Sequence, residues 1–244
     1  ATHPTLELLF TTGEEHFCVG AKAFDAQRLQ SKTAYVMDLS GPVGDCAVAA
    51  PTLITFSAEV VGKAAHAGFA PEDGVHAIQV AAAAVANLPS GRWGDVTVNV
   101  GTISGGRATN IVPDSCTVTG EIRALCHQDA LDRLNEIHSE FVEQAQAVDA
   151  KLNFNHTIHI TGYRVDTDAP VAQRFKQACA VVGVTPRFTD TYGGSDCNIL
   201  SAHGIQGLVV ATAMNNCHAV NEYTTVEELC KAGRLAQALM EKQD

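Results

Sequence analysis

The spacing of apolar residues between about residues 51 and 162 changes in a fixed order, and this order most constrains the fold. In residues 53–60, LITFSAEV, every second residue is apolar, as in a strand with one buried face. Residues 71–88 start with Pro71 and then place apolar side chains along one side of an expected helix. Two more strands, a second helix and a last strand are expected over 96–100, 116–123, 134–148 and 154–160. This βαββαβ order predicts an antiparallel sheet covered on one side by two helices, which is a ferredoxin-like domain.

The flanks of this unit follow a different pattern. Residues 6–11 (LELLFT) and 33–38 (TAYVMD) are nearly continuous apolar runs, as expected of strands buried on both faces, with a short helix between them. After the central unit, the pattern predicts a helix, a buried strand and a capped helix over 169–183, 207–214 and 224–240. We therefore expect one α/β domain formed by residues 1–50 and 163–244, with residues 51–162 inserted into it.

Composition and charge exclude several classes of protein. The chain of 244 residues is 46% hydrophobic, which is enough for a sizeable core. Its formal net charge of −11 argues against binding to nucleic acid or anionic membranes. It has no apolar run of about 18 residues and no basic start of a signal peptide, so we expect a cytoplasmic protein. The eight cysteines form no C-x-x-C pair, which predicts reduced and mostly buried thiols.

Polar residues follow each of the expected buried strands of the flanks. Glu14 and Glu15 come after residues 6–11, Asp38 closes the next run, and His218 follows the C-terminal strand. Ligand sites of open α/β sheets lie at strand ends, and carboxylate oxygen with imidazole nitrogen suits zinc or another hard cation. Each residue alone also fits an ordinary role, as a solvated loop pair, a turn aspartate or a structural histidine. Together they predict a metal site at one edge of a shared sheet.

The sequence resembles the co-catalytic zinc peptidases of the peptidase T, carboxypeptidase G and aminoacylase family, most closely the peptidase T-like branch. The resemblance is carried, in the family's order, by TTGEEHFCVGAKAFD, MDLSGPVG, GKAAHAGFAPEDGVHAIQVAA, GTISGGRATNIVPD, GEIRAL, YGGSDCNIL and CHAVNEYTTVEEL. It implies a zinc-binding α/β catalytic domain with an inserted ferredoxin-like lid. It also implies metal-dependent hydrolysis of a peptide bond in small peptides, of the tripeptide aminopeptidase type. N-acyl amino acids, which the same family hydrolyses, stay open as substrates.

The resemblance also implies roles for residues of the metal site. Glu14 is expected to be the general base that takes a proton from a zinc-bridging water, which is work that carboxylates perform well. Glu15 and His218 are expected to bind one Zn²⁺, and Asp38 is expected to bind the second.

Further positions are expected to bind substrate. In the lid, His66 matches a histidine that enters the partner subunit's site and stabilises the oxyanion, which predicts a homodimer formed through the lid. Asn110 and Arg123 match positions that hold the substrate carboxylate. The glycine loop formed by Gly193, Gly194, Ser195 and Asp196 matches a loop on the substrate side. From the pattern alone, His66 is a turn residue, Arg123 an exposed strand residue and the glycine loop an ordinary turn.

Two features depart from the family pattern. Phe17 stands where the family usually has glycine, two residues after the glutamate pair. Full-length members carry an H-x-D motif and a bridging aspartate before the strand equivalent to LELLF, and this sequence has no H-x-D upstream of its glutamate pair. Without them neither zinc has the three protein ligands usual for catalysis. We therefore expect this chain alone to be an inactive fragment of a metallopeptidase; the alternative is a non-catalytic remnant that serves dimerisation or peptide binding.

Overall fold

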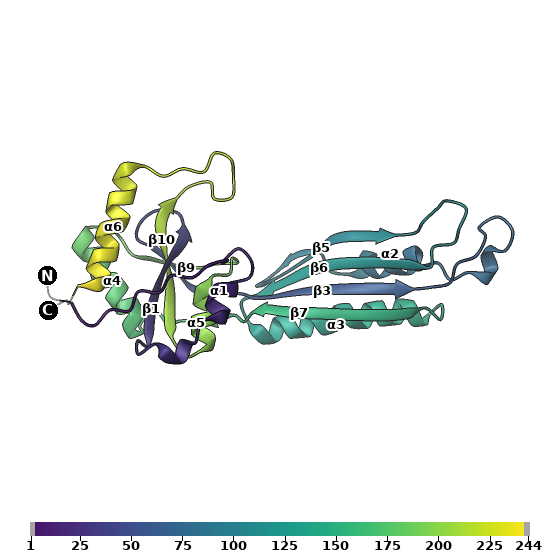
Figure 1. Ribbon diagram of the computed structural model, residues 1–244, viewed down its shortest axis with the longest axis horizontal. Helices are drawn as coiled ribbons and strands as arrows, with labels where there is room; N and C mark the ends of the chain where they lie inside the picture. Colours follow the sequence, from purple (N-terminus) through teal and green to yellow (C-terminus); the bar gives the residue numbers. More distant parts are fainter. Residues whose placement is uncertain (1–2, 242–244) are drawn as a thin grey trace. The chain divides into compact units, whose positions relative to one another are not determined.

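The computed structural model describes residues 3–241 and consists of two compact units (Figure 1). The flanking unit comprises Ala1–Pro51 and Ile160–Asp244, and the inserted unit comprises Thr52–His159. Both units combine helices and strands, so the expected mixed α/β fold is confirmed. No helix in the described part of the chain is long and apolar enough to cross a lipid bilayer.

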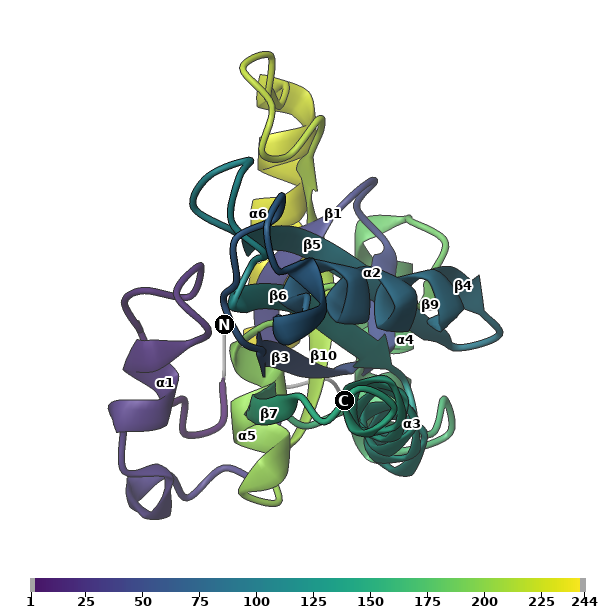
Figure 2. The same cartoon turned by 90° about the vertical axis from the view of Figure 1, so that its right-hand side faces the viewer.

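The inserted unit is a five-stranded sheet in the order β4-β5-β6-β3-β7, with α2 and α3 on one side (Figure 2). Its strands are β3 (Thr52–Val61), β4 (Gly91–Trp93), β5 (Val96–Gly105), β6 (Ser115–Ala124) and β7 (Lys151–Ile160). Its helices are the 3-10 turn η2 (Pro71–Asp73), α2 (Ala77–Asn87) and α3 (His127–Gln146). The pairs β3–β6, β5–β6 and β4–β5 are antiparallel.

Alternation along the strands places the core of the inserted unit under the two helices. Ile54 on β3 and Ile122 on β6 are fully buried and directly paired, and Phe141 of α3 packs against the same side. The helix expected from Pro71 begins instead at Ala77, because the residues after Pro71 form a 3-10 turn and the helix is capped later. The cap is the His76 side chain, whose Nδ1 accepts a hydrogen bond from the Gln79 amide at 3.3 Å. The short hairpin strand β4 was not expected.

The flanking unit is a mixed sheet in the order β1-β10-β2-β8, in which β9 also pairs with β2. Helices α4 and α6 lie against one face, and α5 lies against the other (Figure 1). The strands are β1 (Thr33–Ser40), β2 (Asp45–Ala50), β8 (Tyr163–Arg164), β9 (Arg187–Asp190) and β10 (Gln206–Met214). The helices are α1 (Val19–Ala23), η1 (Ala26–Arg28), α4 (Pro170–Val182), α5 (Asp196–Ala202) and α6 (Val226–Met240). The expected helices after residue 169 and strand before residue 214 are therefore present.

The first apolar run of the flanking unit does not form the expected strand. Residues 6–11 are irregular, and Leu8 and Phe10 are 71% and 90% exposed. The Glu7 carboxylate in this run instead accepts hydrogen bonds from the Gln30 and Ser31 amides. The second run forms β1, but at the edge of the sheet beside β10, so its side chains are only partly buried. Apolar composition predicted burial in both cases, whereas burial also needs a neighbouring element that covers the residues.

Other local predictions are confirmed. Thr225 caps α6, because its hydroxyl accepts a hydrogen bond from the Glu228 amide at 3.2 Å. All eight cysteines are free, and five of them are buried.

Candidate functional site

Glu14 and Glu15 lie in a tight turn between the irregular residues 6–11 and α1. The Cys18 amide donates to the Glu14 carbonyl at 2.9 Å, which closes the turn. Phe17 and Cys18 both have left-handed backbones, with φ of 57° and 58°. Phe17 thus adopts the conformation that glycine accepts most readily, at the position where the family usually has glycine. Glu14 is half-buried and Glu15 is exposed, so the two neighbouring carboxylates have different surroundings.

Three segments far apart in the sequence bring their polar residues together at this turn. His218, in the loop between β10 and α6, places its Nδ1 3.6 Å from Glu15 Oε1. Asp38 lies near the end of β1. Partial desolvation, followed by the charges of Asp196 and Glu15, raises the pKa of Asp38, and His218 lowers it. Desolvation, followed by the charges of Asp38, Glu15 and Asp196, also raises the pKa of Glu14.

Glu15, Asp38 and His218 have side chains that suit a metal ion, but they are too few to complete a metal site. Carboxylate oxygen and imidazole nitrogen are suitable zinc ligands, and crowded carboxylates favour a neighbouring cation. However, within residues 3–241 no group of three or more His, Cys, Asp or Glu side chains is arranged to hold a metal ion. Glu15 and His218, expected at one ion, and Asp38, expected at the other, therefore give neither ion the three protein ligands usual for catalytic zinc.

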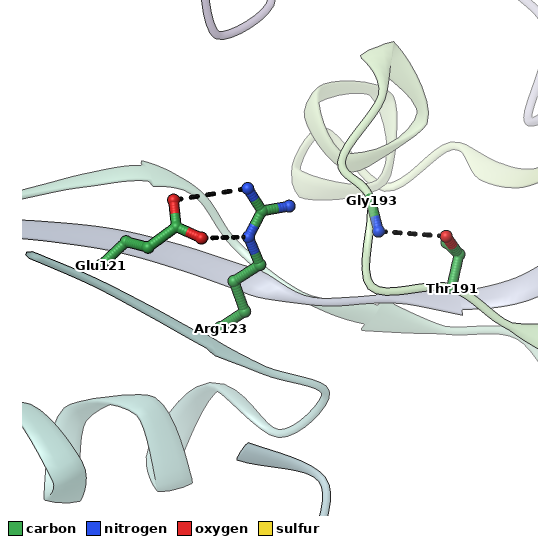
Figure 3. Close-up of polar contacts among 4 residues, drawn as sticks. All are labelled: Glu121, Arg123, Thr191 and Gly193. Atoms are coloured by element: carbon green, nitrogen blue, oxygen red, sulfur yellow. Dashed lines mark hydrogen bonds and ion pairs between the residues drawn. The ribbon is translucent and has the colours of Figure 1, made fainter. Parts of the chain in front are cut away.

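The glycine loop before α5 is held mainly by its own hydrogen bonds. The Gly193 amide donates to the Thr191 hydroxyl at 3.1 Å (Figure 3). Gly194 must be small, because a Cβ there would lie 2.2 Å from the Ile160 side chain. The Ser195 hydroxyl is buried and caps α5 by accepting from the Cys197 amide at 3.2 Å. The Ser195 hydroxyl is thus engaged in capping α5.

In the inserted unit, His66 and Asn110 lie on neighbouring loops beyond one end of the sheet. The Ala67 amide donates to the Asn110 carbonyl at 3.0 Å. His66 Nδ1 accepts from the Gly68 and Phe69 amides at 3.1 and 3.2 Å. Because Nδ1 is an acceptor, the neutral ring carries its proton on Nε2, which is the atom left to donate outward. The Phe69 ring stacks on His66 at a centroid distance of 4.3 Å.

Arg123 lies at the other end of β6. Its Nε and Nη2 donate to the Glu121 carboxylate at 2.9 and 3.4 Å (Figure 3). The opposite end of β6 begins at Ser115, which pairs with Val61 just before the His66 loop. At about 3.3 Å per residue, the strand from Ser115 to Arg123 spans about 26 Å. The structure therefore groups His66 with Asn110 and separates Arg123 from both.

A depression of about 430 Å³ lies on the inserted sheet, on strands β3, β5, β6 and β7. Hydroxyl and amide side chains line it, together with Glu121, the partner of Arg123. None of the sequence-predicted site residues contributes to it.

Two further residues lie near the turn: Thr11, which the sequence did not single out, and Asp196, which belongs to the loop expected on the substrate side. Asp196, the first residue of α5, accepts a hydrogen bond from the Thr11 hydroxyl. Its charge contributes to raising the pKa values of both Glu14 and Asp38. The family resemblance indicated the GGSD loop that contains Asp196, but not its contact with Thr11.

Comparison with known proteins gives a consistent set of relatives. A family model described as a peptidase dimerisation domain matches residues 48–149. The uncharacterized protein YqjE of Bacillus subtilis is 33% identical, over 98% of this chain and 65% of the relative. The crystal structure of aminopeptidase PepT from Bacillus cereus has a TM-score of 0.90 and 36% identity, covering 94% of this chain and 62% of that one. A tripeptidase from Staphylococcus aureus has a TM-score of 0.91 and 27% identity, covering 95% and 62%.

The chain spans less than two thirds of the length of each of these relatives. A more distant structure, the YXEP protein of Bacillus subtilis, is described as a dinuclear metal binding peptidase from the M20 family. It has a TM-score of 0.63 and 16% identity, so it shares the fold alone.

Proposed function

Because this chain belongs to the M20 family of peptidases, we propose that the protein hydrolyses a peptide bond in small peptides, as an aminopeptidase of the tripeptidase type. Two of its structural relatives are an aminopeptidase and a tripeptidase. The observation that carries the proposal is the convergence of Glu14, Glu15, Asp38 and His218 from three separate segments.

Glu14 is the general base of the proposed reaction. Its raised pKa brings it closer to neutral pH than an ordinary carboxylate, which makes it a better proton acceptor while it remains ionised. Glu15, Asp38 and His218 are the ligands that this chain contributes to a metal centre of two zinc ions. Zinc, when bound, lowers the pKa of a coordinated water from 15.7 to about 7. A complete centre needs more ligands than Glu15, Asp38 and His218, since each catalytic zinc usually has three from protein.

His66 donates from Nε2 to the oxyanion that forms as the peptide carbonyl is attacked, and Asn110 and Arg123 bind the substrate carboxylate. An extended tripeptide spans only about 10 Å, far less than the length of β6 between the two groups. A single inserted unit therefore cannot present His66 and Arg123 to the same tripeptide. Two copies can do so, which supports a homodimer through the inserted unit, where one subunit contributes His66 and Asn110 and the other contributes Arg123.

The test is hydrolysis of tripeptides, dipeptides and N-acetyl amino acids by the full-length protein supplied with zinc, cobalt or manganese. Glu14→Gln should lower kcat by about 10²- to 10⁴-fold, because it removes a positioned base but keeps the size of the side chain. Glu72→Gln is the control, since Glu72 is exposed in η2 of the inserted unit. Absence of turnover with every substrate and metal would favour the non-catalytic alternative, and preferred cleavage of N-acetyl amino acids would reassign the substrate class.

A further inference from the structure

We propose that Asp196 is a positioning residue that fixes the turn carrying Glu14, through contacts with Thr11 and Cys18 on the two sides of that turn. The inference rests on the proposed function, because it assigns Asp196 to the geometry of the same base. Asp196 itself touches neither substrate nor water in this assignment.

The contacts of Asp196 reach both sides of the turn. The Thr11 hydroxyl, three residues before Glu14, donates to Asp196 Oδ2 across 185 positions of sequence. Cys18, four residues after Glu14, is 2% exposed, and its Sγ lies 4.0 Å from Glu14 Oε1. Burial, then the charges of Asp196 and Glu14, raises the pKa of the Cys18 thiol to about 12. The thiol therefore stays protonated at neutral pH and lies close to both carboxylates.

The element that carries Asp196 is firmly anchored. Ser195 and Asn198 form a capping box at the start of α5, with the Ser195 amide donating to Asn198 Oδ1 at 3.1 Å. Asn198 Nδ2 donates to the carbonyl oxygens of Pro51 and Thr161 at 3.1 and 2.9 Å. Asn198 is 1% exposed, so these bonds are shielded from water. Asp196 thus extends from a fixed helix start toward a turn that has little regular structure of its own.

Two features of the surroundings of Asp196 are unfavourable for the folded state. Its Oδ1 is shielded from solvent and has no hydrogen-bond partner among the described residues. An unpartnered buried acceptor is unfavourable, and a further negative charge beside Glu14 and Asp38 is unfavourable as well. An aspartate that combines these two features with a hydrogen bond to the turn of Glu14 fits a geometric role in the site.

That geometric role matters because a general base must stay within about 2.6–3.2 Å of the atom whose proton it takes. Glu14 lies on a turn with two consecutive left-handed residues, and such a turn does not hold one geometry without outside contacts. A displacement of about 1 Å can lower the rate about 100-fold. The bond from Thr11 and the contact with Cys18 therefore limit the position of Glu14.

The experiment uses the full-length protein with matched variants at both partners. Thr11→Val and Asp196→Ala remove the hydrogen bond, and each should lower kcat by about 10- to 100-fold, with KM changed much less. Thr11→Ser and Asp196→Asn keep a donor and an acceptor, and both should stay within about threefold of wild type. Thr12→Val is the control for a lost hydroxyl on the neighbouring residue. The double variant Thr11→Val/Asp196→Ala should be no worse than the poorer single variant.

Three readouts separate this proposal from its alternatives. If Thr11→Val and Asp196→Ala turn over like Thr12→Val, or if Asp196→Asn is as slow as Asp196→Ala, the positioning role is wrong. A purely structural role would instead lower the melting temperature of both variants below that of Thr12→Val, which we do not expect. If the wild-type protein hydrolyses nothing, the proposed function fails, but hydrogen exchange of amides 13–18 still tests whether the contact of Thr11 with Asp196 fixes the turn. Faster exchange in Thr11→Val and Asp196→Ala than in Thr12→Val supports the positioning role, and equal exchange overturns it.

Discussion

The two units differ most in the regularity of their backbones. Among the described residues other than glycine, positive φ occurs at one position of the inserted unit, Asp149. In the flanking unit it occurs at Phe17, Cys18, Ala213, Asn216 and His218. Such conformations are unfavourable for side chains with a Cβ and persist only where surrounding structure enforces them. The flanking unit therefore places strain beside its candidate site, while the inserted unit presents its site residues from a regular sheet and the loops at its ends.

The units also differ in how completely they cover their apolar residues. Ten consecutive residue pairs join β3 to β6 in the inserted unit, over a core closed by two helices. The flanking unit joins β10 to β2 through only two pairs. Among the described residues it exposes eleven large apolar side chains, whereas the inserted unit exposes six, the most exposed being Phe69. Exposed apolar surface of this kind marks a region that associates with other protein surface. The inserted unit is thus the better candidate for independent folding.

The largest expected effect tests whether His66 and Arg123, at opposite ends of the inserted unit, act in one site formed by two subunits. If His66 and Arg123 act as proposed, His66→Ala and Arg123→Ala should each lower activity by about 100-fold or more, because each would remove an interaction with the reacting peptide. If each site takes His66 from one subunit and Arg123 from the other, a mixed dimer has one intact site and one doubly altered site. Unfolding and refolding the two inactive variants together should therefore restore about a quarter of wild-type activity through reassorted dimers.

The control for this complementation is a mixture of His66→Ala with His66→Gln, which cannot form an intact site. No recovery in the His66 and Arg123 mixture, with mixed dimers demonstrated by differential tagging, would place both residues in one subunit's site. That result would contradict the argument from the length of β6.

A second prediction tests whether the two cores are independent. Phe141→Ala in the inserted unit should lower its stability by about 3–5 kcal/mol, and Leu235→Ala in the flanking unit by about 2–5 kcal/mol, since both side chains are fully buried. Trp93 is the single tryptophan and reports on the inserted unit by fluorescence. Labelling of the buried thiols Cys46 and Cys179 reports on the flanking unit.

Each variant should shift mainly the denaturation curve of its own unit. Equal shifts of both probes by either variant would show one cooperative unit, and the contrast between the cores would then be wrong.

This contrast also explains which parts of the fold the sequence predicted. Ile54, Val118 and Phe141 are buried as their spacing indicated, because a strand or helix with one covered face has a period that can be read directly. Residues 6–11 had the composition of a strand but no pairing partner among the described residues, and composition contains no information about partners. The start of α2 was misplaced because Pro71 also suits a 3-10 turn.

The candidate site also has a part that the sequence indicated and a part that it did not. Strand ends and the family resemblance indicated Glu14, Glu15, Asp38 and His218, and the structure brings these four into mutual electrostatic range. The contact of Thr11 with Asp196 joins residues 185 positions apart, and no local pattern predicts such a pair.

A third prediction uses alkaline pH. Burial raises the pKa values of Cys179 and Cys197 in the flanking unit to about 11, and it also raises that of Cys46. In the unfolded chain these thiols ionise near pH 9, so above that pH the unfolded state releases protons that the folded state retains. Stability of the flanking unit is therefore full below pH 9 and falls toward pH 11, by about 1 kcal/mol per thiol at pH 10.

In the inserted unit burial raises the pKa of Cys116, whereas in the flanking unit it raises those of Cys46, Cys179 and Cys197, so the inserted unit should lose less stability. The measurement is guanidinium unfolding at pH 8 and pH 10, followed by Trp93 fluorescence for the inserted unit and by far-ultraviolet circular dichroism for both. The prediction is wrong if, between pH 8 and pH 10, the guanidinium midpoint followed by Trp93 fluorescence falls more than the midpoint of the other transition seen by circular dichroism.

The smallest expected effect concerns backbone strain at single positions. Phe17 has a φ of 57°, where a Cβ is unfavourable by about 1–2 kcal/mol, so Phe17→Gly should be more stable than Phe17→Ala by about 1 kcal/mol. At the exposed helical position Ala82 of α2, glycine should instead destabilise by about 1 kcal/mol. The denaturant midpoint of the glycine form should therefore be higher than that of the alanine form at position 17 and lower at position 82. If glycine is worse than alanine at position 17 as well, the turn beside Glu14 is not strained, and the backbone contrast between the units does not hold there.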